Sequence, residues 1–293
     1  MTSLADLVRT QGFVVFDGAM GTMLQGAGLD DGGAPELWNV EKPEVILGIH
    51  EAYLMAGARV ITTNTFGGTR PRLEMHGLGD RVLELSEAGA RLARQAADTF
   101  GALVAGDLGP TGELLEPLGT LTPDQAQDLF AEQLEGLMAG GIDLVLIETM
   151  SDLAEMEAAV RAARQVATDL PVVATLSFDT KGRTMMGVTP AQAVTRLAEL
   201  GVTAVGANCG RGPEEMETVM AEMVGSRPEG LLLIAQSNAG LPQLVGDRFE
   251  YTAPPPVLAA HAVRLRARGV DLIGACCGST PDHTRAVHDA LAG

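Results

Sequence analysis

The chain has 293 residues, of which 46% are hydrophobic but only 3% aromatic, and its formal net charge at pH 7 is −18. This negative charge opposes binding to nucleic acid and to anionic membrane surfaces, so we expect neither as a partner. No apolar run approaches the roughly 18 residues of a membrane helix, and residues 1–20 lack the features of a signal peptide, which predicts a cytoplasmic protein with reduced thiols.

Short β-prone runs alternate along the chain with longer segments whose apolar residues recur at three- and four-residue spacing. The predicted strands are residues 13–17, 59–65, 103–107, 143–149, 172–178, 204–209, 231–237 and 271–276. The predicted helices are residues 43–56, 81–99, 122–139, 153–167, 190–200, 214–224, 255–268 and 281–291. Eight strand–helix repeats predict a single-domain (β/α)8 TIM barrel over residues 1–293, with an open doubly wound sheet as the alternative.

Two glycine-, aspartate- or proline-rich segments interrupt this alternation, at residues 26–35 and 240–256. We expect both to be long loops, after the first and the seventh strand. Loops at the carboxyl ends of barrel strands build the active site of such enzymes. These two segments are therefore candidates for covering a substrate.

Polar residues collect where the predicted strands end, whereas the strand interiors are apolar. The candidate substrate-binding residues at these ends are Asp17, Gly18, Ala19, Asn64, Glu148, Asn208 and Asn238, and Asp107 ends the third strand. Some of these residues could instead be purely structural: Asp17 and Asp107 could cap helices, and Asn64 could stabilise a turn. Glu148 directly follows the apolar run 144–147, where an unpaired charge is costly, and this favours a functional role.

The chain contains three cysteines, and each ends a predicted strand that runs into a glycine turn. Cys209 lies in 206–210, and Cys276 and Cys277 lie in 274–279. They could be small buried hydrophobic residues, or Cys276 and Cys277 could form a strained vicinal disulfide. If their strands are neighbours, however, three sulfurs converge. Three thiolates with an open fourth position are typical of a catalytic zinc site.

The strand-end motifs resemble those of the homocysteine S-methyltransferase family, which includes the homocysteine-binding module of cobalamin-dependent methionine synthase and betaine–homocysteine methyltransferase. The matching segments are residues 17–22, 63–66, 106–110, 206–209 and 274–278, in the expected order. The resemblance implies a (β/α)8 barrel and a zinc ion bound by Cys209, Cys276 and Cys277. It also implies that Asp17 and Glu148 hold the amino group of homocysteine, with the amides around Gly18 and Ala19 near its carboxylate.

The chemistry of such a site is consistent with this resemblance. A free thiol has a pKa of about 8.5 and is mostly protonated at neutral pH, whereas methyl transfer needs a thiolate. A coordinating metal removes the thiol proton. We therefore expect zinc-dependent formation of methionine from homocysteine, with Cys209, Cys276 and Cys277 as the catalytic ligands.

The methyl donor is not specified by the residues. No folate or cobalamin module is visible in this sequence, so we expect either a separate corrinoid protein carrying methylcobalamin, or a methylfolate system. The alternatives are S-methylmethionine or betaine as donor, a non-catalytic zinc- and homocysteine-binding subunit, and a different thiol acceptor.

Two further residues have more than one interpretation. His283 follows the cysteine pair and could be a fourth ligand, but we expect it in the first turn of the last helix, pointing away, because catalytic zinc keeps an open position. Trp38, the only tryptophan, could line the path of the donor or pack beneath the first long loop.

Overall fold

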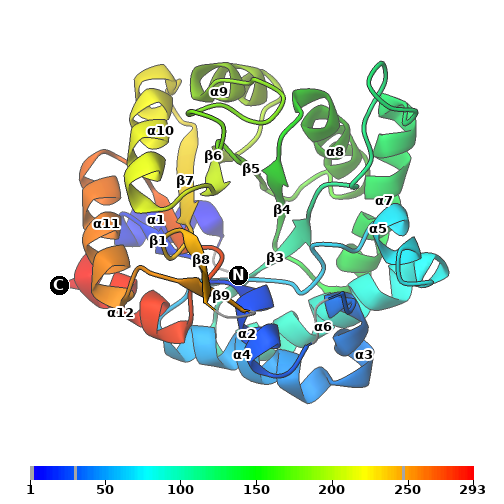
Figure 1. Cartoon of the computed structure of the whole chain (residues 1–293), viewed down its shortest axis with the longest axis horizontal. Helices are drawn as coiled ribbons and strands as arrows, with labels where there is room; N and C mark the ends of the chain where they lie inside the picture. Colours follow the sequence, from blue (N-terminus) through cyan, green and yellow to red (C-terminus); the bar gives the residue numbers. More distant parts are fainter. Residues whose placement is uncertain (1–2, 30–31, 246–247) are drawn as a thin grey trace.

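The computed structural model describes residues 3–29, 32–245 and 248–293. Within them, eight parallel strands form one sheet in the order β1-β10-β7-β6-β5-β4-β3-β2 (Figure 1). They are β1 (Val14–Val15), β2 (Val60–Thr62), β3 (Leu103–Leu108), β4 (Leu144–Met150), β5 (Val172–Leu176), β6 (Ala204–Cys209), β7 (Leu232–Ser237) and β10 (Leu272–Ala275). A parallel bridge from Phe16 to Val60 joins the two ends of this order. The sheet is therefore a (β/α)8 barrel as predicted, and the doubly wound alternative is wrong.

Every predicted helix is present. They are α4 (Pro43–Met55), α6 (Val82–Phe100), α7 (Pro123–Gly140), α8 (Leu153–Val166), α9 (Pro190–Glu199), α10 (Pro213–Ser226), α11 (Pro255–Ala267) and α12 (Pro281–Ala292). Capping boxes at Thr122 and Thr189, each followed by proline, explain why α7 and α9 begin there. The sequence pattern did not reveal the short elements α1 (Leu4–Gln11), α2 (Met20–Gly26), η1 (Pro35–Leu37), α3 (Trp38–Glu41), α5 (Arg70–Glu74) and η2 (Gly79–Arg81).

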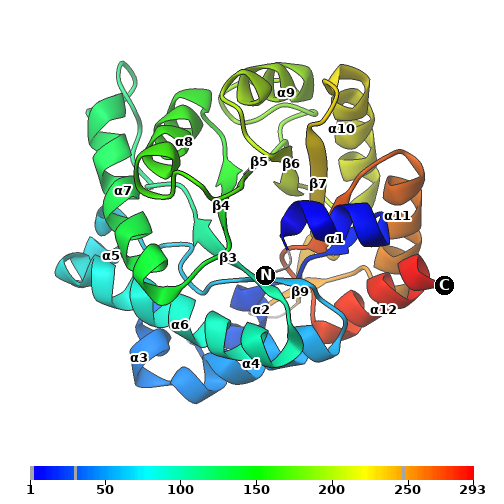
Figure 2. The same ribbon diagram turned by 180° about the vertical axis from the view of Figure 1, so that it is seen from behind.

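Apolar side chains form two layers around the sheet. The inner layer fills the barrel and includes Phe16, Val60, Leu146 and Ile234, while the outer layer lies between the strands and the helices. Leu4 and Leu7 of α1 belong to the inner layer, so α1 closes the end of the barrel where the strands begin (Figure 2). The opposite end, which we call the mouth, is where the strands finish.

Segment 240–256 is not simply a loop, which corrects the prediction. Strands β8 (Pro242–Val245) and β9 (Arg248–Tyr251) pair in antiparallel register, and Figure 1 places this hairpin in front of the barrel, on the side away from α1. The segment contains residues that favour strands, such as Val245 and Phe249, beside its glycines and prolines, which obscured the pattern.

The other predicted loop, residues 26–35, begins at the end of α2 and leads to η1. Residues 30 and 31 of this segment, and 246 and 247 of the hairpin, lie outside the described residues. In the part of the chain that is described, no helix is both long enough and apolar enough to cross a membrane.

Candidate active site at the barrel mouth

The three cysteines come together at the mouth although Cys276 lies 67 residues after Cys209 in the chain and Cys277 follows it directly. Cys209 is the last residue of β6, and Cys276 and Cys277 directly follow β10. The sulfurs of Cys209 and Cys276 are 3.1 Å apart and those of Cys276 and Cys277 are 3.9 Å apart. All three sulfurs lie within 4.8 Å of one another, and the cysteines are free and partly buried.

These three sulfurs fit the donor set of a metal such as zinc. Tetrahedral coordination with Zn–S bonds of about 2.3 Å separates sulfur ligands by about 3.8 Å. The distance of 3.9 Å between Cys276 and Cys277 matches this value, and the distance of 3.1 Å between Cys209 and Cys276 is shorter. Hydrogen bonds from Cys209 and Cys276 lower the pKa of Cys277 to about 3, whereas hydrogen bonding to Cys209 and Cys277, together with burial, raises the pKa of Cys276. The cluster by itself therefore favours one thiolate, and a cation would stabilise the ionised form of all three.

Backbone strain and a buried amide fix the end of β6. Cys209 has φ 59°, a left-handed conformation that costs a non-glycine residue about 1 kcal/mol or more. The preceding residue, Asn208, is fully buried. Its Oδ1 accepts hydrogen bonds from the Thr149 amide and the Thr175 hydroxyl, both at 3.0 Å, and its Nδ2 donates to Thr149 Oγ1 at 2.6 Å. Asn208 thus holds the ends of β4, β5 and β6 together.

Glu148 lies in an irregular part of β4. The register to β5 shifts between Ile147 and Met150, and Thr149 has φ 62°. Bulges of this kind redirect side chains near active sites. Burial, assisted by the neighbouring charges of Cys277 and Asp17, raises the pKa of Glu148 to about 8. Asn208 Nδ2 lies 3.5 Å from Glu148 Oε2 and 3.7 Å from Cys209 Sγ, so Glu148 is close to the sulfurs. A second carboxyl group influences it as well.

Asp17 is that second carboxyl group, and it is almost completely buried. Its oxygens accept hydrogen bonds from the amide and the hydroxyl of Thr62, at 2.7 and 2.9 Å. Burial nevertheless outweighs these bonds and raises the pKa of Asp17 to about 7. Thr62 was not singled out from the sequence, because a threonine in a strand carries no signal of this role.

The glycine turn after Asp17 is held by the end of the chain. The Ala19 amide donates to Ser279 Oγ at 3.0 Å, so this N–H already has a partner. The Tyr53 hydroxyl donates to the Ala19 carbonyl at 3.1 Å. A side chain on Gly18 would lie 2.6 Å from Ser279 Oγ, so the turn requires glycine there.

Four other candidate residues are engaged in structural contacts. Asn64 Nδ2 donates to the Pro35 carbonyl and to Asn39 Oδ1, and Asn238 Nδ2 donates to the Gly210 carbonyl. His283 lies in the first turn of α12, and its Nε2 bonds the Ala253 carbonyl, as expected for a residue that is not a ligand. Trp38 is a buried member of the outer core, with Lys42 Nζ 3.7 Å from the ring centroid. Packing is therefore the role that the structure gives Trp38.

The hairpin contributes Tyr251, which the sequence pattern did not single out. A β-carbon on Gly278 would lie 2.0 Å from Tyr251 Cγ, so the tyrosine ring lies directly on the turn after Cys277. Burial and the nearby Cys277 charge raise the pKa of Tyr251. The chain beyond Tyr251 is anchored by a hydrogen bond of 2.9 Å from the Ala253 amide to the Ala239 carbonyl.

A buried polar chain supports the cysteine pair from behind. His261 Nε2 bonds Ser237 Oγ at 2.7 Å, and its Nδ1 bonds Glu217 Oε1 at 2.9 Å. The Ser237 carbonyl accepts a hydrogen bond from the Cys276 amide at 2.8 Å. The Ser237 side chain is only 1% exposed, so this chain positions β7 beside Cys276 rather than offering a nucleophile. Nothing in the sequence spacing of Glu217, Ser237 and His261 predicts these hydrogen bonds.

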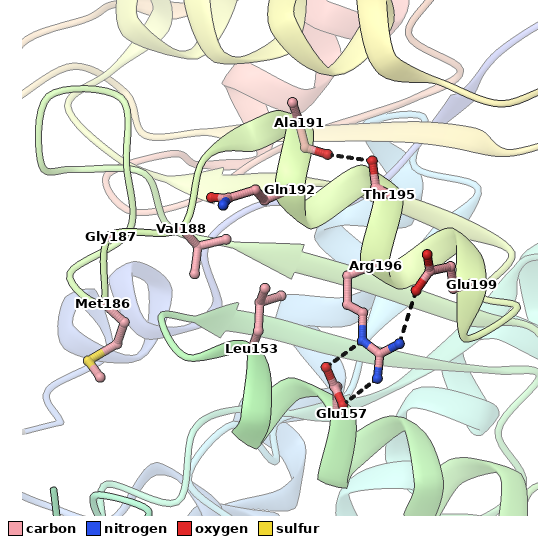
Figure 3. A pocket seen from close by; sticks show the side chains of 10 residues that line it. All are labelled: Leu153, Glu157, Met186, Gly187, Val188, Ala191, Gln192, Thr195, Arg196 and Glu199. Carbon is pink, nitrogen blue, oxygen red and sulfur yellow. Dashed lines mark hydrogen bonds and ion pairs between the residues drawn. The ribbon is translucent and has the colours of Figure 1, made fainter.

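A separate groove lies outside the barrel, between α8 and α9 (Figure 3). Its volume is about 640 Å³, and Arg196 crosses it to pair with Glu157 and Glu199. The residues that line it do not include the cysteines or the buried carboxyl groups of the mouth. The groove is therefore distinct from the candidate active site.

Comparison with known proteins identifies the family of this chain. The family model for homocysteine S-methyltransferase matches residues 14–291. The chain belongs to the homocysteine S-methyltransferase family. The resemblance predicted from the motifs is therefore confirmed, and the family is one of methyltransferase enzymes.

Individual relatives support the family assignment. The chain is 38% identical to methionine synthase of Mycobacterium tuberculosis and 37% identical to that of Mycobacterium leprae, over 99% and 98% of its own length. It spans only 25% of the length of each. Among solved structures, the homocysteine methyltransferase MmuM from Escherichia coli, in its metallated form, has a TM-score of 0.81 at 25% identity, with 98% of this chain and 99% of that chain covered.

Proposed function

We propose that this chain is a zinc-dependent homocysteine S-methyltransferase that transfers a methyl group to the sulfur of homocysteine and forms methionine. The observation that carries the proposal is the convergence of three cysteine sulfurs within 4.8 Å of one another, with Glu148 linked to Cys209 through Asn208 Nδ2. The metallated form of the E. coli relative supports a metal at this place. Zinc is the metal that three thiolates and one open position suit best.

Each end of the substrate has matching groups in the mouth. Cys209, Cys276 and Cys277 would hold zinc, which when bound would supply the positive charge that keeps the substrate thiol ionised near neutral pH. Glu148 and Asp17 suit the ammonium group, because carboxylates accept its hydrogen bonds. Backbone amides around Gly18 suit the carboxylate, although the Ala19 amide must first release Ser279 Oγ.

The reaction then consists of one bond exchange. A new bond forms between the homocysteine sulfur and the methyl carbon, while the bond from that carbon to the donor breaks and its electron pair leaves with the donor. The fixed positions of Glu148 and Asp17 hold the amino acid so that its sulfur faces the open side of the mouth. The thioether sulfur of the product is neutral. It lacks the negative charge by which a cation in the mouth would attract the substrate sulfur.

For the donor, we favour methylcobalamin on a corrinoid protein or a methylfolate system. Identity of 38% to a methionine synthase supports this choice. S-methylmethionine and betaine are the alternatives, as is a non-catalytic subunit that binds zinc and homocysteine. We place the activity in the cytoplasm, because three adjacent free thiols need reducing conditions.

The first test measures methionine formed by the reduced, zinc-loaded protein from homocysteine, with each of the four donors supplied separately. Turnover with one donor identifies the reaction and the donor. Binding of homocysteine without turnover would support a missing corrinoid partner or the non-catalytic subunit. Absence of homocysteine binding would refute the acceptor.

Two variants test the roles of the residues. Cys276→Ser should lower zinc occupancy and abolish turnover in a folded protein, and stoichiometric zinc with full activity would refute the metal site. Glu148→Ala should weaken homocysteine binding while zinc is retained. The exposed Glu229→Ala variant is the control and should bind homocysteine like the unmodified protein.

A further inference from the structure

One buried carboxyl group in the mouth has no role in the proposed function. Asp107 lies near the end of β3, where Leu103 and Ala105 belong to the inner core of the barrel. Because side chains alternate along a strand, Asp107 faces the barrel interior too. It is only 3% exposed, and its Oδ1 has no hydrogen-bond partner among the described residues. A buried acceptor without a donor is costly, so the position suits a ligand that donates.

The surroundings of Asp107 supply negative charge. Asp107 is paired in register with Leu146, so Glu148 lies two residues further along the neighbouring strand and on the same face. Burial, followed by the charges of Glu148, Asp17 and Glu36, raises the pKa of Asp107. Every charged group that acts on Asp107 in this way is a carboxyl group. The position is one layer deeper in the barrel than Glu148.

A second unpaired acceptor lies across the barrel. Gln236 of β7 is 4% exposed, and its Oε1 also lacks a hydrogen-bond partner within the described residues. It lies on the same strand face as Ile234 of the inner core. Strands β3 and β7 are four positions apart in the ring of eight strands, on opposite walls. Each of these two walls therefore presents a buried acceptor that an N–H donor of a ligand would satisfy.

We propose that Asp107 is a third substrate-binding carboxylate, which accepts a hydrogen bond from the α-ammonium group of the amino acid and selects substrates that carry it. This inference rests on the proposed function and extends it. Glu148 and Asp17 bind the ammonium group from the rim, and Asp107 binds it from below. The sequence offered only a helix cap as an alternative for Asp107, and no helix begins directly after β3 among the described residues.

The experiment compares two thiols that differ in the amino group. The affinities of homocysteine and of 4-mercaptobutanoate, which lacks the amino group, are measured by calorimetry on the zinc-loaded protein and on Asp107→Asn. The variant should bind homocysteine at least tenfold more weakly and 4-mercaptobutanoate with unchanged affinity. Asp124→Asn, which removes the same charge from an almost fully exposed side chain, should change neither affinity.

The remaining outcomes separate the two proposals. Equal weakening of both thiols in Asp107→Asn, or no change in homocysteine affinity, would overturn the role of Asp107 and leave the proposed function intact. Failure of homocysteine to bind the unmodified protein would overturn both. If Asp107→Asn does not fold, Asp107→Ala provides the same comparison and should show the same loss of selectivity.

Discussion

Replacing Asn208 with alanine should destabilise the barrel more than its size suggests. Asn208 Oδ1 accepts hydrogen bonds from the Thr149 amide and the Thr175 hydroxyl, and the asparagine is completely buried. Each buried donor left without an acceptor costs about 1–3 kcal/mol. Because Thr149 is already strained at φ 62°, it has little freedom to find another partner. We therefore expect Asn208→Ala to lower the free energy of unfolding by about 2–4 kcal/mol.

Urea unfolding of the chelated, reduced protein measures this loss without a contribution from metal. A double-mutant cycle with Thr175→Val isolates the bond between the two side chains. The double variant should be less destabilised than the sum of the single variants by about 1 kcal/mol, because the unpaired Thr175 hydroxyl is then absent. A loss below about 1 kcal/mol in Asn208→Ala, or strict additivity in the cycle, would refute the reasoning.

Three further outcomes are expected. Burial lowers the pKa of His50 to about 4, below the usual 6.5, so the unfolded chain takes up this proton at a higher pH than the folded chain does. The free energy of unfolding should therefore fall by about 3 kcal/mol as the pH drops from 6.5 to 4. The His50→Leu variant should lack this part of the pH dependence of unfolding. Gly278→Ala should lower stability and metal affinity, because the φ of 80° at Gly278 is left-handed and an added β-carbon would overlap Tyr251. Gly225→Ala is the control and should not destabilise the protein, because the space around Gly225 is open. Metal titration and thermal unfolding of both variants check this. Removal of zinc with a chelator should lower the unfolding free energy by about 2.7 kcal/mol relative to protein at a free zinc concentration 100 times its Kd. The circular dichroism spectrum should stay unchanged, because the apolar core is complete without the metal. Loss of secondary structure would contradict this.

The fold could be predicted because the relevant signals are local. The run Leu144–Ile147 is apolar at every position, which is required of a strand covered on both faces, and threonine–proline pairs mark where α7 and α9 begin. The β8–β9 hairpin was missed because its pairing depends on contacts between two short runs set among glycines and prolines. Short strands of this kind are specified by their partner and not by their own composition.

The candidate site could be predicted only in part, for a related reason. A barrel brings all strand ends to one rim, so the location of Asp17, Glu148 and the cysteines at the mouth could be predicted from the strand ends, while their roles stay predictions. The direction in which a side chain turns is decided by its partners. Asn64, placed in the site by the sequence, is bonded instead to Asn39 and Pro35. The bulge at Glu148 and the bond from His261 to Ser237 likewise depend on contacts distant in sequence.

The ring order of the strands also divides the mouth by chemistry. The sulfurs come from β6 and from the turn after β10, whereas the carboxyl groups of Asp17, Asp107 and Glu148 come from the arc that runs from β1 through β2 and β3 to β4. Several buried acids on one wall repel one another and resist ionisation, so an apolar wall would be more stable. A cationic ligand group would offset this cost, and the thiols at either side of this arc would be stabilised as thiolates by a cation of their own. The amino acid proposed as substrate would satisfy both sets of groups at once, with its ammonium group on the carboxyl groups and its sulfur beside the cysteines.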